Sequence, residues 1–177
     1  MEATGIVRRI DELGRIVLPK EMRRTLRIRE GDSFEVFVDA GREIILRKYS
    51  IIGELGDFVK EYAKALSDSL NQPILICDCD EYVAASGVES DYIGKEISVR
   101  MDNIIMDRVP VLNNNANRFS FIDQTVEEVQ SYAIMPIIKD GHTIGAVIIF
   151  SKNSMLSEIE MKSLEIAVHF LSNQIES

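Results

Sequence analysis

Hydrophobic and polar residues alternate in short runs over the first fifty residues of the chain. A period of two is typical of half-buried strands. Strands are predicted in four segments: residues 4–10, 15–18, 33–39 and 43–49. Between the second and the third, Pro19 can open a short helix that ends near Leu26, because the first helical turn does not use the N–H that proline lacks. Gly14 can take the positive φ of a tight turn.

Such short elements provide only a small hydrophobic core, because a short chain buries a modest fraction of its surface. We therefore expect two copies of this first part of the chain to pair. Pairing would complete the sheet of each copy and remove exposed strand edges.

Two later segments repeat apolar residues every three or four positions, which is the spacing of an amphipathic helix. The first covers residues 54–70. The second begins at Ser157, where Glu160 three residues later predicts a capping box. The apolar face of the second comprises Met161, Leu164, Val168, Leu171 and Ile175. The helix of residues 54–70 either packs on a C-terminal domain or joins chains into oligomers.

The second part of the chain contains longer apolar runs that predict further strands: residues 74–77, 82–86, 131–138 and 143–150. Residues 139–142, Lys-Asp-Gly-His, predict a hairpin turn between the last two. Residues 90–122 show only short helical pieces and one short strand at 118–122. This order of helices and strands predicts an α+β sandwich. We expect three parts: a first domain at 1–50, a helical linker at 51–72 and a second domain at 73–177.

Charge is distributed unevenly along the chain. The whole protein has a formal net charge of -9, yet residues 5–29 contain eight Lys/Arg and only three Asp/Glu. Residues 1–50 carry a net charge of +2, which leaves -11 for residues 51–177. Because attraction to phosphate depends on charge within a Debye length, a local basic patch in an acidic protein indicates a surface for a polyanion, and DNA is the leading candidate.

Other functional classes find little support in the sequence. The only cysteines, Cys77 and Cys79, have no second pair of cysteines with which to complete a zinc site. We expect both to be small thiols that behave as apolar side chains at the end of a strand. His142 and His169 are expected in surface and packing roles, and no glycine-rich phosphate loop is present. We therefore expect no enzyme activity, no metal and no cofactor. No run of 18 apolar residues occurs, so we expect a cytoplasmic protein without a membrane partner.

Residues 4–28, TGIVRRIDELGRIVLPKEMRRTLRI, followed by GDSFEVFVD and IILRKY, resemble the AbrB-type transition-state regulators. The turn glycine, the helix-opening proline and the paired arginines occur in the order of that family. The resemblance implies a swapped-hairpin β-barrel, made by two interleaved chains, that binds double-stranded DNA. It assigns DNA contacts to four residues: Arg8, Arg15, Arg23 and Arg24. Charge and position add Arg9 and Lys20 to this set.

The segments ILICDCDEYVAASG and SYAIMPIIKDGHTIGAVIIFS resemble the opening and closing strand pairs of a GAF domain, a fold that senses small ligands. The middle of the second part shows no comparable motif and names no ligand-binding residue. An AbrB-type domain followed by a GAF-like domain is similar to regulators of sporulation over nearly the whole chain.

We therefore expect a transcriptional regulator, an activator or a repressor of sporulation genes, that binds DNA at the nucleoid. Its C-terminal domain would set the oligomeric state, dimer or tetramer, and would sense an effector if one exists. The alternative is an assembly module of the antitoxin type, which engages a partner protein rather than DNA. Antitoxins usually recognise toxins through a short flexible tail, whereas this chain continues for about 120 patterned residues. That length favours the regulator.

Overall fold

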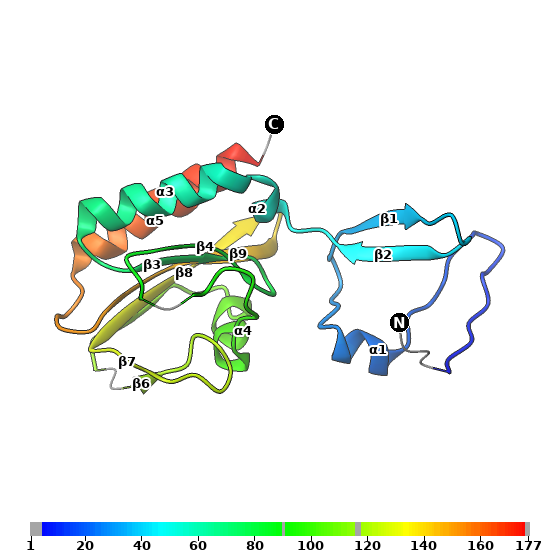
Figure 1. The fold of residues 1–177 in the computed structure, drawn as a ribbon, viewed down its shortest axis with the longest axis horizontal. Coiled ribbons are helices and arrows are strands. Elements are labelled where there is room, and N and C mark those ends of the chain that lie inside the picture. Colours follow the sequence, from blue (N-terminus) through cyan, green and yellow to red (C-terminus); the bar gives the residue numbers. More distant parts are fainter. Residues whose placement is uncertain (1–4, 90, 116–117, 176–177) are drawn as a thin grey trace. The chain divides into compact units, whose positions relative to one another are not determined.

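The chain forms two compact units in a computed structural model that describes residues 5–89, 91–115 and 118–175. The first unit, Met1–Lys48, is called the head below, and the second, Tyr49–Ser177, is called the tail (Figure 1). The tail unit includes residues 51–72, which the sequence suggested as a linker.

The head contains one helix and one hairpin. Helix α1, Lys20–Thr25, follows Pro19 at the N-cap and ends with Leu26 at the C-cap, which confirms the predicted helix. Strands β1, Phe34–Val38, and β2, Ile44–Lys48, pair antiparallel and confirm the second pair of predicted strands.

The first pair of predicted strands is absent from the described head. Residues 5–10 and 15–18 have no ladder partner, and Thr4 lies outside the described residues. A turn at 11–14 joins them, with the Asp11 N–H donating to the Arg15 carbonyl over 3.0 Å. The strand prediction is wrong for the single chain because extended backbone becomes a strand only when a neighbouring strand accepts and donates its hydrogen bonds.

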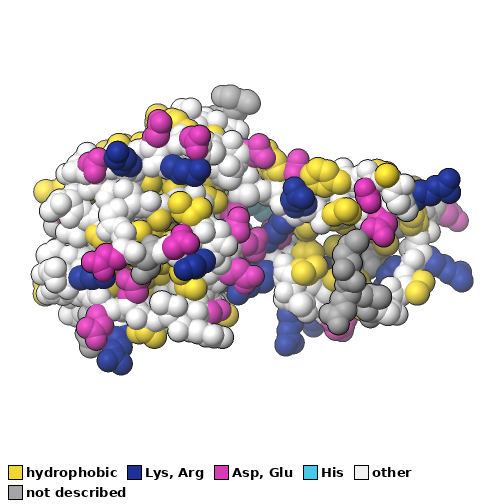
Figure 2. All heavy atoms as spheres, in the orientation of Figure 1, with side chains coloured by type: hydrophobic (Ala, Val, Ile, Leu, Met, Phe, Trp, Pro, Cys, Tyr) yellow, Lys and Arg dark blue, Asp and Glu magenta, His cyan; other side chains and the backbone are white. Residues whose placement is uncertain are grey.

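The described head has almost no interior of its own. Among residues 5–48, Pro19 alone is buried, whereas Val7 is 84% and Val38 is 77% exposed. Hydrophobic side chains accordingly lie on the surface of this unit (Figure 2). Alternating apolar residues are thus present, as the sequence predicted, but no second layer covers them.

The tail is built on a five-stranded antiparallel sheet in the order β4-β3-β9-β8-β5. Its strands are β3 Ile74–Cys77, β4 Tyr82–Ser86, β5 Val111–Asn113, β8 Ser131–Lys139 and β9 His142–Ser151. Four of them confirm the predicted strands, and the hairpin turn between β8 and β9 is also confirmed. β5 was not predicted. A separate small ladder pairs β6, Arg118–Phe119, with β7, Glu127–Glu128.

Helices cover both faces of this sheet (Figure 1). On one face lie α2, Ile51–Glu54, α3, Gly56–Leu70, and α5, Glu158–Gln174. On the other face lies α4, Val99–Met106, together with a cluster of aromatic side chains. Strand residues alternate between the two cores: Ile74 and Ile76 face α3 and α5, whereas Leu75 and Cys77 face α4. Burial on both faces explains why these strands are continuously apolar.

The ends of the long helices follow from local chemistry. At the start of α5, the Ser157 hydroxyl accepts from the Ile159 N–H over 3.1 Å, and the Glu160 carboxylate accepts from the Ser157 N–H over 2.7 Å. The predicted capping box is therefore confirmed. Helix α3 ends at Asn71, which takes a left-handed conformation. None of the helices in the described ranges is both long and apolar enough to span a membrane.

Candidate nucleic-acid interface

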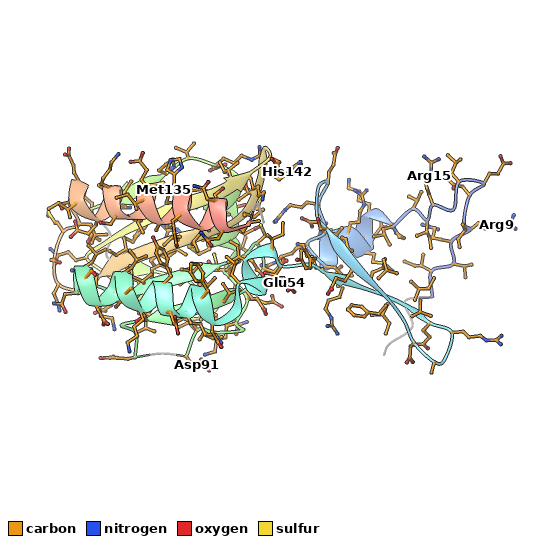
Figure 3. All side chains as sticks on the ribbon, turned by 90° about the horizontal axis from the view of Figure 1, so that it is seen from above. Arg9, Arg15, Glu54, Asp91, Met135 and His142 are labelled. Carbon is orange, nitrogen blue, oxygen red and sulfur yellow. The ribbon has the colours of Figure 1, made fainter. Side chains whose placement is uncertain are left out.

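The six predicted DNA-contacting side chains are all exposed on the head. They occur in two groups. Arg8, Arg9 and Arg15 lie on the unpaired segments on either side of the turn, where Figure 3 labels Arg9 and Arg15. The second group belongs to α1 and comprises Lys20, Arg23 and Arg24, whose spacing of three and four makes them neighbours on the helix surface. Within the described residues, no hydrogen bond or ion pair joins the two groups.

Most of these cations make no ion pair with another residue that the structure describes. In the described part of the chain, Arg9, Lys20, Arg23 and Arg24 make no ion pair, and Arg8 only donates from Nη1 to the Val7 carbonyl over 3.2 Å. Five exposed positive charges per head are therefore available to an external anion. Their proximity in sequence and their exposure favour a polyanion over a small ligand.

Lys48 and Arg29, two other basic residues of the head, have internal partners instead. Lys48 Nζ lies 3.1 Å from Asp32 Oδ2 and also donates to the Arg27 carbonyl over 3.1 Å. The Arg29 backbone N–H donates to Asp32 Oδ2 over 2.8 Å. Hence Lys48 and Asp32 link this part of the head through one ion pair and through hydrogen bonds to the backbone of Arg27 and Arg29.

The end of α1 is fixed by its own backbone. Arg27 takes a left-handed conformation with φ of 50°, and the Ile28 N–H then reaches back to the Arg23 carbonyl over 2.7 Å. This closure is the Schellman pattern, which satisfies carbonyls left free at a helix end. Arg23 and Arg24 lie in the last turn, where positive charge interacts favourably with the helix dipole.

Arg15 differs from the other five cations because it is paired. Its Nε lies 2.7 Å from Asp11 Oδ2, while Asp11 Oδ1 accepts from the backbone N–H groups of Leu13 and Arg15. These contacts, led by the Arg15 backbone hydrogen bond, lower the pKa of the Asp11 carboxyl. Gly14, with φ of 74°, completes the turn. The sequence pattern did not predict the Asp11–Arg15 pair, because hydrophobic periodicity and charge excess do not show which acidic residue a given arginine contacts.

The tail offers a different kind of surface. Phe58 and Tyr62 of α3 and Phe170 of α5 form a ring cluster, with centroids of Tyr62 and Phe170 5.1 Å apart. Figure 3 shows α3 and α5 side by side above the sheet. Ile159 and Ile166, which share a face of α5 with Phe170 by their spacing, are 70% and 60% exposed. This helix face is therefore apolar and uncovered in the single chain.

A polar cleft of about 380 Å³ lies where α3, β4 and β9 end. Among its lining side chains, Lys152 Nζ lies 3.8 Å from a Glu89 oxygen and 3.9 Å from a Glu127 oxygen. Burial raises the pKa of the Glu127 carboxyl, which also accepts a hydrogen bond from the Tyr92 hydroxyl. The face of the sheet that α4 covers is packed with rings, and there the Tyr82 hydroxyl donates to the Phe121 carbonyl over 2.8 Å.

Cys77 and Cys79 are free thiols, the first buried and the second half-buried. Desolvation raises the pKa of the Cys77 thiol well above its ordinary value, which makes it unreactive. Cys79 Sγ donates to the Thr143 carbonyl over 3.2 Å. No group of three or more possible metal ligands is found in the described parts of the chain.

Two sequence families match the two units. The family described as "Stage V sporulation protein T C-terminal, transcription factor" matches residues 54–176. The family described as "Antidote-toxin recognition MazE, bacterial antitoxin" matches residues 7–53.

Relatives in Bacillus subtilis (strain 168) extend this result. The chain is 52% identical to stage V sporulation protein T over an alignment of 177 residues, and this alignment covers 99% of both chains. It is 51% identical over 63 residues to the transition state regulatory protein AbrB, which covers 32% of this chain and 65% of that protein. The AbrB-type resemblance of the first part is therefore confirmed.

Solved structures confirm the GAF-like fold of the tail. The GAF domain from an Acinetobacter phosphoenolpyruvate-protein phosphotransferase aligns with a TM-score of 0.52 at 16% identity, covering 72% of this chain and 82% of that one. A methyl-accepting chemotaxis protein segment, residues 122 to 287, aligns with a TM-score of 0.58 at 19% identity, covering 71% and 90%. At these identities the likeness concerns the fold alone. The full-length similarity and the match over the tail show that the chain belongs to the family of stage V sporulation protein T.

Proposed function

We propose that this protein is a DNA-binding transcriptional regulator of sporulation genes. The observation that carries the proposal is a set of five exposed cations on the head that make no ion pair with any described residue, in a protein whose net charge is -9. The full-length relative, a sporulation protein, and the transcription-factor description of the matching family support it. Neither resemblance nor geometry points to catalysis, and a regulator of this kind acts at the nucleoid in the cytoplasm.

The DNA-binding form is a dimer through the head. A head in which Pro19 alone is buried among the described residues has apolar strands without a covering layer. A second copy would supply that layer and the missing ladder partners for residues 5–10 and 15–18. The AbrB-type resemblance implies such an interleaved barrel, and twofold symmetry would double the number of exposed cations.

DNA contacts are assigned to Arg8, Arg15, Arg23 and Arg24 from the resemblance and to Arg9 and Lys20 from their charge and position. Guanidinium groups can donate two parallel hydrogen bonds to a phosphate or to the edge of a guanine. The five cations without an ion pair mainly attract phosphate. Their binding releases counterions from the DNA, so the affinity depends on the salt concentration.

The test is a titration of DNA duplexes with the full chain over a series of salt concentrations. Each lost phosphate contact lowers the salt slope by roughly 0.9, so Arg23→Ala in a dimer should lower it by about 1.8 and weaken binding. Arg47→Ala is the matched control, because Arg47 lies over the Phe37 ring at 4.8 Å and is not among the assigned contacts. Unchanged affinity and slope in both Arg15→Ala and Arg23→Ala would contradict the assignment.

The tail would join head dimers into tetramers. The uncovered face of α5, which comprises Ile159, Ile166 and Phe170, supports a contact between tails. Linking DNA-binding heads raises the effective concentration of the second head after the first has bound. A small-molecule effector stays a prediction, and the polar cleft beside Lys152 has the volume of known ligand sites.

The antitoxin alternative is not favoured. Its support is the match of residues 7–53 to an antitoxin family, which the head's fold explains equally well. The relative that matches the chain over its full length is a sporulation protein.

A further inference from the structure

Asp11 organises the turn that presents Arg15. Its carboxylate accepts three hydrogen bonds: from the Leu13 N–H at 3.0 Å, the Arg15 N–H at 2.8 Å and Arg15 Nε at 2.7 Å. Its backbone adds two more, since its N–H donates to the Arg15 carbonyl and its own carbonyl accepts from the Gly14 N–H, both at 3.0 Å. Backbone and side chain of Arg15 are thus held by one residue.

This pairing changes what Arg15 can do at a DNA surface. With Nε committed to Asp11, the two terminal amino groups of the guanidinium remain for an external acceptor. The turn also contains Glu12, so Asp11, Glu12 and Arg15 together carry a net charge of -1. Such a turn attracts phosphate poorly, in contrast to α1, where Lys20, Arg23 and Arg24 stand beside Glu21 alone.

A guanidinium that is already oriented is better suited to recognising a particular base sequence than to attracting phosphate in general. A side chain already held in one geometry loses less conformational entropy when it binds, and a fixed fork tolerates fewer arrangements of acceptors. Arginines without such a partner, for example Arg23 and Arg24, can follow any phosphate within reach. The head therefore contains two chemically different kinds of arginine.

We propose that Asp11 is a positioning residue that holds Arg15 for sequence discrimination, while the unpaired cations supply sequence-independent attraction to phosphate. The inference rests on the proposed function. It adds a division of labour among the arginines, and it assigns to an acidic residue a part in specific recognition of DNA.

Asp11→Asn is the informative substitution. The asparagine carbonyl can still accept from the Leu13 and Arg15 N–H groups, and asparagine suits this kind of turn, so the backbone should stay in place. The amide has no charge with which to hold the guanidinium. Glu12→Gln is the matched control, because it removes the same charge from the same turn but breaks no contact within the described chain.

The experiment uses two duplexes: one selected from a random pool by the wild-type full-length protein, and one of the same composition with shuffled sequence. We expect Glu12→Gln to strengthen binding to both duplexes by the same factor. Asp11→Asn should strengthen binding to the shuffled duplex but lower the ratio of the two affinities roughly tenfold, within the 5- to 150-fold that a good bidentate contact discriminates. An unchanged ratio, or an equal fall in Glu12→Gln, would overturn the proposal.

Arg15→Lys is a second variant, in which the charge and the hydrogen bonds of the turn backbone are kept but the fork is lost. Arg15→Lys should lower the ratio of the two duplex affinities as Asp11→Asn does. If Asp11→Asn changes the thermal midpoint of the protein, the ratio measured with Arg15→Lys is used instead, and an unchanged ratio there overturns the proposal. Salt-dependent binding by the wild type without preference for any duplex would refute this inference alone. Absence of salt-dependent DNA binding would refute the proposed function itself.

Discussion

Replacing Ile166 by alanine would separate assembly of the tail from its folding. Ile166 is 60% exposed, so most of its side chain contributes little to the core of a single chain. The substitution removes three carbons, each worth about 0.8 kcal/mol on full burial, so covering the exposed part contributes about 1.4 kcal/mol. A twofold interface contains two copies, and their loss should weaken association by about 3 kcal/mol, roughly a hundredfold in the dissociation constant.

The assay follows the dissociation of the proposed tetramers into dimers by sedimentation velocity over a concentration series. Thermal unfolding should change little, because substitutions at exposed positions usually alter stability by less than about 0.5 kcal/mol. Val126→Ala is the control, since Val126 is 58% exposed but lies outside α3 and α5. Equal dissociation constants for Ile166→Ala and the wild type would refute the helix-face contact.

Two further predictions concern the tail itself. Gly145→Ala should destabilise the tail by about 2–4 kcal/mol in urea unfolding, because a Cβ at this position would lie 2.1 Å from the Cys77 carbonyl oxygen and would force β3 away from β9. The control is Gly141→Ala, where a Cβ would meet no other atom and only the positive φ of 77° is strained. A loss of stability no larger than that of the control would contradict the prediction. The hydrogen bond from Ser157 lowers the pKa of the Glu160 carboxyl below its ordinary 4.5. The capping box therefore stabilises the tail above pH 4.5, and this contribution is lost as the pH falls through the lowered pKa. Glu160→Gln should flatten this part of the pH–stability profile, and a profile parallel to that of the wild type would argue against the cap.

Most of the tail could be predicted because its signals are local. The strands of residues 74–77 and 131–138 are apolar at every position that a doubly covered sheet requires, and Ser157 with Glu160 marks the start of α5. β5 escaped prediction because Val111–Asn113 is only three residues long and becomes a strand through pairing with β8. Strand identity there depends on a contact between residues far apart in sequence.

The structure of the head could be predicted only in part, because it depends on contacts that the sequence pattern does not show. Alternation in residues 5–10 correctly reports which positions are apolar, but the backbone there has no partner within the described chain. The exposed arginines could be predicted as a charge excess, yet their division into paired and unpaired groups depends on the Asp11–Arg15 contact. An i, i+4 ion pair across a turn has no periodic signature, so the sequence pattern did not distinguish Arg15 from Arg23.

The difference between the two units bears on how DNA binding would be controlled. The tail covers both faces of its sheet with its own helices and rings, so its fold is independent of chain concentration. The described head lacks such an interior, so on the proposed assembly its folding is linked to association, and its population depends on chain concentration. Contact between tails would then raise the local concentration of heads. A signal that loosens the tail contact would therefore lower DNA occupancy without touching any arginine, because it would reduce the number of completed heads.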